Sequence, residues 1–192
     1  MKNKIKFALY ILIILFLSHK YAYSEKFEYE ADKIRILEEG NIIAGYEDIE
    51  IKISNNIFIS ANRFTYNRDL GLLTIIDNVI FNDTLNKINS TSSKILFYEK
   101  SEILEITGDV RLKDDINKIK ITSSKIIFLE KSGLLEITGD VRLEDDINKI
   151  NASGEKIFYS KNLNKIYSNS KTNIIYNNDY DINLDDFDYD IT

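Results

Sequence analysis

The feature that most constrains the fold of this chain is a stretch of sequence that occurs twice, 31 residues apart. Residues 105–112 (EITGDVRL) return at 136–143, and residues 114–119 (DDINKI) return at 145–150. A weaker copy precedes these two around residues 63–83, and the start of another follows them. A fixed period of this length indicates stacked supersecondary units, none of which can bury its apolar face alone.

Inside a unit, apolar and polar residues alternate. Ile119 and Ile121 share one parity and polar residues occupy the other, which indicates half-buried β-strands. The Gly-Asp pairs at 108–109 and 139–140 predict a turn or kink between short strands, and the Asp-Asp-Ile-Asn motif predicts another turn. No window after residue 25 has helical spacing. The sequence therefore predicts an all-β, solenoid-like stack of about four 31-residue repeats, each with three or four short antiparallel strands.

One set of positions stays mostly apolar from unit to unit while its neighbours are polar, so the stack is expected to have a continuous apolar interior. This interior is either a packed core or a groove that does not close. The candidate lining residues are Ile57, Ile59, Phe64, Tyr66, Val79, Phe81, Ile95, Phe97, Val110, Leu112, Ile119, Ile121, Ile126, Phe128, Val141, Leu143, Ile157 and Tyr159.

The first 24 residues have the pattern of a secretory signal peptide. Three lysines precede an apolar run at residues 7–17, and Ala22 and Ser24 form a small-x-small end, so cleavage is expected after Ser24. The alternative is an uncleaved membrane anchor, but this run has about half of the roughly 20 residues that a spanning helix needs. Cleavage would remove four lysines and leave 21 basic and 31 acidic residues, a net charge of −10. That charge argues against nucleic acid as a partner.

The residue inventory argues against an enzyme. The chain has no cysteine, and its single histidine, His19, lies in the expected signal peptide. Thiol nucleophiles, Ser-His triads and the usual zinc ligand sets are therefore excluded. A pair of carboxylates could act as in glycosidases, and Asp114 with Asp145 is the candidate pair. These two residues are more simply interpreted as solvated turn residues, and no cofactor or metal is expected.

The acidic C-terminal segment, residues 179–192, has two interpretations. Oxygen-bearing residues at 179, 181, 183, 185 and 190 partly match a calcium-binding loop, but Leu184 stands where that loop requires glycine. The same acids alternate with apolar residues, as an edge strand would have them. Acidic side chains on such a strand discourage uncontrolled edge pairing.

The repeat also resembles a known family. The pattern of a basic residue, an apolar residue and an aromatic residue, followed by Gly-Asp-Val-x-Leu, is found at 94–98 with 108–112 and at 125–128 with 139–143, and its first half at 61–66. It resembles the OstA-like repeat of the lipopolysaccharide transport family, over roughly residues 27–178. That family includes LptA-type periplasmic bridges, anchored LptC-type proteins and the N-terminal domain of LptD-type outer-membrane assembly proteins.

The resemblance implies a twisted β-jellyroll that is open along one edge and carries the acyl chains of lipid A, the lipid part of lipopolysaccharide, in an apolar groove. It also implies a periplasmic location, with or without outer-membrane association, and end-to-end strand pairing with other jellyroll proteins of the family. Residues 166–172 and 180–182 resemble the exit from the LptD N-terminal domain, so the LptA and LptD types both stay open. An LptC-like anchored protein and a structural β-solenoid without ligand are the alternatives.

These considerations divide the chain into a signal peptide (1–24), an OstA-like β-jellyroll domain (25–178) and an acidic C-terminal strand or tail (179–192). A stack of β units leaves an unpaired strand at each end. The sequence places these edge strands around residues 28–36 and 174–184.

Overall fold

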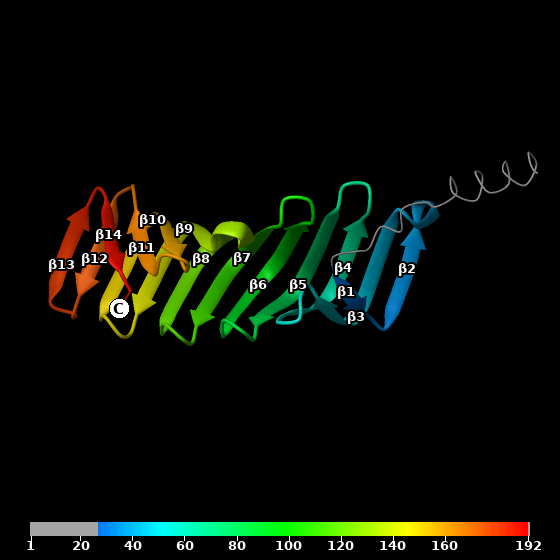
Figure 1. Cartoon of the computed structure of the whole chain (residues 1–192), viewed down its shortest axis with the longest axis horizontal. Coiled ribbons are helices and arrows are strands. Elements are labelled where there is room, and N and C mark those ends of the chain that lie inside the picture. The colour runs from blue at the N-terminus through cyan, green and yellow to red at the C-terminus, as the bar shows by residue number, and fades with distance from the viewer. Residues whose placement is uncertain (1–26, 192) are drawn as a thin grey trace, which may run out of the picture.

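The computed structural model describes residues 27–191, which form one antiparallel sheet of 14 strands, so the expected signal peptide lies outside the described residues. The sheet is elongated, with β2 at one end and β13 at the other (Figure 1). Its elements are β1 (Glu28–Glu30), β2 (Lys33–Leu37), η1 (Glu38–Gly40), β3 (Ile42–Lys52), β4 (Ile57–Asn67), β5 (Leu72–Asp83), β6 (Ile88–Tyr98), β7 (Ile103–Asp114), β8 (Ile119–Leu129), η2 (Glu130–Ser132), β9 (Leu134–Asp145), β10 (Ile150–Ser160), β11 (Lys165–Ser168), β12 (Thr172–Tyr176), β13 (Tyr180–Leu184) and β14 (Phe187–Asp190).

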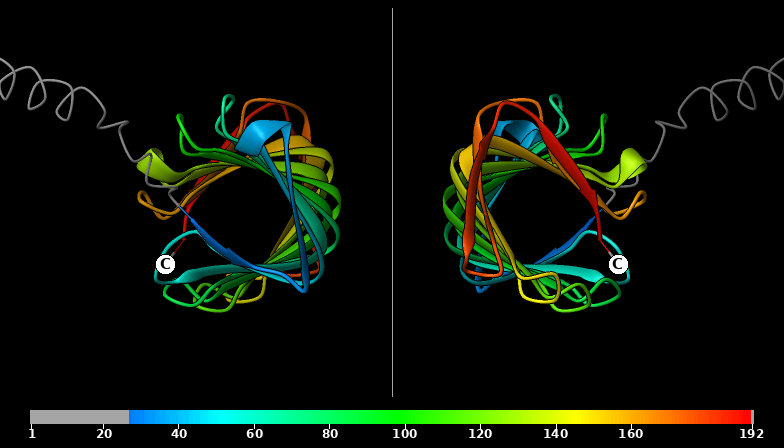
Figure 2. Two further views of the ribbon diagram at one scale, coloured as in Figure 1. Left: turned by 90° about the vertical axis from the view of Figure 1, so that its right-hand side faces the viewer. Right: turned by 90° about the vertical axis from the view of Figure 1, so that its left-hand side faces the viewer.

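The path of the sheet is open: it runs from β1 through β3 to β10 and on to β11 and β14, and it does not return to its start. This confirms an all-β, twisted and open architecture. Viewed along the long axis, the strands lie around a common interior (Figure 2). No helix within residues 27–191 has the length and apolarity that a membrane crossing requires.

Each repeat contains two long strands rather than three or four short ones. The Gly-Asp pairs are bulges inside continuous strands: Gly108 has φ +83° and Asp109 has φ +47°, and the register with β8 shifts between Thr107 and Val110. Gly139 and Asp140 form the equivalent bulge in β9, also with positive φ angles and a shift of register with β8. A bulge bends a strand without ending it, so the prediction of separate short strands was wrong.

The bulges divide the sheet lengthwise into two halves that face each other across the interior. Half-sheet A contains Ile103–Thr107 of β7 and the segments paired with it, and half-sheet B contains Val110–Asp114 and its partners. Residues of one parity on both halves form a single cluster of buried hydrophobic side chains. The predicted apolar interior is therefore confirmed, and it follows from the period-two alternation in every unit.

Both ends of the sheet have two edges, one for each half. At the N-terminal end, β2 and β1 pair with separate parts of β3, on half-sheets A and B respectively. At the C-terminal end, β14 is the edge of half-sheet A and β13 the edge of half-sheet B. The predicted edge at residues 174–184 is therefore wrong in its first part, because β12 lies between β10 and β13.

Candidate binding interior and its seam

The structure brings the predicted lining residues together in one interior. All of them are buried except Phe128, which is half-buried and packs against the same cluster. The cluster also includes a row on the odd-numbered strands that sequence reasoning left out of the lining set. The row recurs at the same 31-residue offset, so the repeat in the sequence could have identified it. It comprises Leu73, Ile75, Leu104, Ile106, Leu135 and Ile137.

The two half-sheets meet along a line that we call the seam, where the strand ends of half-sheet A approach the strand ends of half-sheet B. Tyr159, near the end of β10 in half-sheet A, donates a hydrogen bond from its hydroxyl to Asp114 Oδ2 at 2.8 Å. Asn117 Nδ2 donates to the same hydroxyl oxygen at 2.7 Å. Both Tyr159 and Asp114 are almost completely buried. Side chains, and not a backbone ladder, therefore connect the halves here.

A second bridge repeats this arrangement one unit later. The hydroxyl of Tyr189 on β14 donates to Asp145 Oδ2 at 3.0 Å. Burial raises the pKa of both Tyr159 and Tyr189 well above the usual tyrosine value, and the aspartate that each contacts raises it further. Both tyrosines consequently keep their protons, and their ability to donate, throughout the physiological pH range.

One unit before Tyr159 and Asp114, the seam has no such bridge. The equivalent residues are Phe128, which has no hydroxyl, and Asp83, whose carboxylate accepts hydrogen bonds from the backbone N–H and side-chain amide of Asn86. Both line a cavity of about 30 Å³ between the half-sheets. Apart from Asp83, the lining is apolar: Phe81, Ile88, Leu104, Ile106, Leu112, Ile126, Phe128 and Leu135.

Ser90 lies beside this cavity. Its cross-strand neighbours are Phe81 and Leu112, which both line the cavity. The interior positions equivalent to Ser90 in the adjacent units are Ile59 and Ile121, so the serine leaves room that isoleucine fills elsewhere. The Ser90 hydroxyl is buried, and no group within residues 27–191 forms a hydrogen bond with it. Burying such a group costs about 1–3 kcal/mol.

The two ends of the interior differ. At the N-terminal end, Phe27 contacts the ring of Tyr66 edge-on at 4.8 Å, and Tyr29 lies 5.0 Å from Phe64. At the C-terminal end, the apolar residues of β13 that point to the interior side are exposed, among them Ile182. Aromatic side chains therefore cover the first end, while apolar residues at the second end remain accessible.

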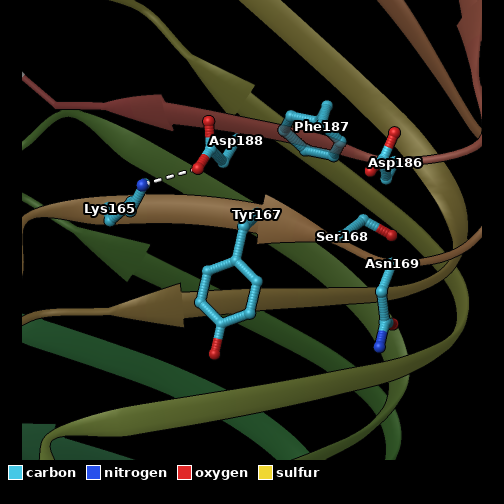
Figure 3. A pocket seen from close by; sticks show the side chains of 7 residues that line it. All are labelled: Lys165, Tyr167, Ser168, Asn169, Asp186, Phe187 and Asp188. Atoms are coloured by element: carbon cyan, nitrogen blue, oxygen red, sulfur yellow. Dashed lines mark ion pairs between the residues drawn. The ribbon is translucent and has the colours of Figure 1, made fainter.

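Beside β14, at this C-terminal end, lies an open recess of about 650 Å³ (Figure 3). An ion pair between Lys165 and Asp188, at 2.6 Å, spans β11 and β14 at one side of it. The other lining residues are Tyr167, Ser168, Asn169, Asp186 and Phe187. This lining mixes charged, polar and aromatic groups, and it contains none of the residues predicted to line the apolar interior.

The other predicted constellations do not form sites. Asp114 and Asp145 are the last residues of β7 and β9, where each accepts hydrogen bonds from backbone N–H groups of the following turn, and both are buried rather than solvated. Each carboxylate is held by the side chains that close the seam. The acidic segment at 179–190 forms β13 and β14, and no three acidic, His or Cys side chains within residues 27–191 converge as metal ligands.

No family model matches this chain, and no curated protein matches it. Among solved structures it is similar to the crystal structure of LptH, the LptA-homologous periplasmic component of the lipopolysaccharide transport device of Pseudomonas aeruginosa. The sequence identity is 10%, the match covers 70% of this chain and 75% of that chain, and the TM-score is 0.29. This match assigns no family to the chain.

Proposed function

We propose that this protein binds acyl chains of lipopolysaccharide in its apolar interior and takes part in carrying that lipid across the periplasm. The observation that supports this most is an apolar interior that runs along an open sheet. Because side chains alone bridge the seam at Tyr159–Asp114 and Tyr189–Asp145, the half-sheets can separate without breaking a backbone ladder. A closed barrel would not allow this.

The energetics favour an apolar ligand. Burial of acyl surface contributes roughly 25 cal/mol for each Å² removed from water. Net charge opposes binding, because the chain is acidic and lipopolysaccharide is a negatively charged lipid. Hydrocarbon contact in the interior is therefore the interaction that would carry the affinity.

We also propose that molecules associate end to end through the edges of half-sheet A. The N-terminal edge strand β2 has Lys33 and Arg35 on its outer face, and the C-terminal edge strand β14 has Asp188 and Asp190 on its own outer face. Placing β14 of one molecule against β2 of the next would bring opposite charges together and satisfy exposed backbone groups. Such head-to-tail contact extends the interior into the neighbour.

A structural stack without ligand is the second candidate, and one observation favours it. The interior is densely packed, and the cavity at Phe128 holds only about 30 Å³. A filament or surface-layer protein would need this packed core and no opening. The two functions differ in whether hydrocarbon can enter.

Native mass spectrometry distinguishes these functions. The purified protein would be incubated with lipid A, and in parallel with the same lipid after its acyl chains have been removed. Retention of the intact lipid alone supports the acyl carrier. Retention of neither lipid overturns the carrier and leaves the structural stack.

A further inference from the structure

The most distinctive part of the interior is the place where its repeating pattern fails. At Asp83 and Phe128 the seam lacks the tyrosine–aspartate bridge found at the next two units. Phe128 is also the one predicted lining residue that is not fully buried. Solvent access and the missing bridge therefore coincide at one position along the stack.

We propose that an acyl chain enters the interior from the side, through a portal between Asp83 and Phe128, and lodges in the space left by Ser90. This inference rests on the proposed acyl-chain function and adds the place of entry. Apart from Asp83 at its mouth, the lining of the cavity is apolar on both half-sheets, which favours a hydrocarbon chain over a polar ligand. The cavity holds only about 30 Å³, so a hydrocarbon chain can enter it only when the Phe128 ring turns aside and the half-sheets separate.

The two tyrosine–aspartate bridges on the C-terminal side of the portal determine where the portal ends along the seam. Each tyrosine hydroxyl donates a hydrogen bond to an aspartate side chain, and opening the seam there breaks that bond. Separating the half-sheets therefore requires less work at Phe128 than at Tyr159. One unit earlier the equivalent residues are Phe97 and Lys52, so the bridge is missing there as well, but Phe97 is buried. The partial exposure of Phe128 therefore places the portal.

The test exchanges these aromatic residues. Phe128→Tyr adds a hydroxyl opposite Asp83, and Tyr159→Phe removes the one opposite Asp114. Uptake of trans-parinaric acid, a straight fatty acid whose fluorescence rises when it leaves water, is followed by stopped flow. We expect about tenfold slower uptake in Phe128→Tyr and faster uptake in Tyr159→Phe. Phe58→Tyr, on the exposed outer face of β4, is the matched control and should leave the rate unchanged.

A second pair of variants tests the lodging site. Ser90→Ile places in the cavity the side chain that Ile59 and Ile121 supply in the adjacent units, whereas Ser90→Ala removes the hydroxyl and keeps the room. We expect Ser90→Ile to lose at least tenfold in affinity for the fatty acid and Ser90→Ala to retain it. The β-signal in circular dichroism confirms that each variant is folded.

The outcomes separate the portal from the function on which it rests. If the wild type takes up the fatty acid but Phe128→Tyr, Tyr159→Phe and Phe58→Tyr all do so at the same rate, chains enter elsewhere and the portal is overturned. If Ser90→Ile binds as the wild type does, the lodging site is overturned. If the wild type binds no fatty acid at all, the acyl-chain function itself is overturned.

Discussion

Tyr159 and Asp114 are 45 residues apart in the sequence, and a hydrogen bond of 2.8 Å joins them across the seam. Tyr159 lies on β10 and Asp114 on β7, and these two strands are not neighbours in the sheet, so no backbone hydrogen bonds pair them. This contact ties the two half-sheets together at a point where the backbone does not. The stability of the closed seam should therefore depend on tyrosine hydroxyls.

Removing this hydroxyl tests that dependence. Tyr159→Phe keeps the ring and removes the hydroxyl that donates to Asp114 across the seam, so we expect the free energy of unfolding to fall by about 2 kcal/mol. Tyr167→Phe is the control, because Tyr167 stacks on Phe158 on the outer face and should change stability little. Equal losses in the two variants, measured by urea unfolding, would show that the seam contact has no special role.

The raised pKa of Tyr159 also predicts a pH dependence. Below about pH 10, the usual tyrosine pKa, both folded and unfolded chains keep the proton and the full stabilisation is present. Above it, the unfolded chain releases the proton while the buried hydroxyl of the folded chain retains it. The unfolded state then binds fewer protons, so stability falls as the pH rises.

Urea unfolding at a series of pH values from about 8 to about 12 measures this effect. The wild type should lose stability more steeply above pH 10 than Tyr159→Phe, because the variant has lost one of the groups that titrate only on unfolding. The remaining tyrosines are common to both proteins and cancel in the comparison. Parallel curves would contradict the assignment of a buried, hydrogen-bonded Tyr159.

The bulge glycines give a prediction about the fold itself. Gly108 has φ +83°, and a Cβ at this residue would lie 2.6 Å from Ser93 Oγ. Gly71 also has a positive φ, +60°, but its nearest neighbour would be 3.4 Å away. We expect Gly71→Ala to cost about 1 kcal/mol from backbone strain alone and Gly108→Ala roughly 2–4 kcal/mol, since overpacking is added. Thermal unfolding would contradict this if the two costs were equal.

Much of this fold could be predicted from the sequence, because the repeat and the alternation are local signals. The 31-residue offset relates Ile119 to Ile150, and the parity of Ile119 and Ile121 identifies the interior face. The continuity of the long strands was missed, because Gly108 and Asp109 have the composition of a turn. Only the pairing with β8 on both sides of them, at Thr107 and at Val110, shows that the strand continues through them.

The seam could not be predicted in the same way. Tyr159 meets Asp114 at a separation of 45 residues, which is not a multiple of the repeat, because the two residues occupy different positions within their units, one near the end of β10 and the other at the end of β7. For the same reason Asp114 was interpreted as solvated although it is buried. Ser90 does stand out in the sequence, as a serine in a row of apolar residues, but its meaning depends on the cavity beside it.

End-to-end association can be tested through charge. Arg35→Asp reverses a charge on β2, and we expect it to weaken self-association in sedimentation velocity experiments. Asp190→Arg on β14 should weaken it as well, and a mixture of the two variants should recover it, since opposite charges again face each other. Recovery would not occur if these edges are not the contact.

The most direct test of the central claim, that hydrocarbon occupies the interior, is site-specific photo-crosslinking to lipopolysaccharide in cells. A photoreactive phenylalanine would replace Phe128, at the seam, or Phe58, which is exposed on the outer face of the same sheet. The two positions carry the same native side chain and differ in the face on which they lie. We predict strong lipid adducts at Phe128, with Phe97 and Ile121 as further interior positions, and none above background at Phe58, Lys120 or Glu105. Equal labelling on both faces, or labelling at neither, would contradict the claim.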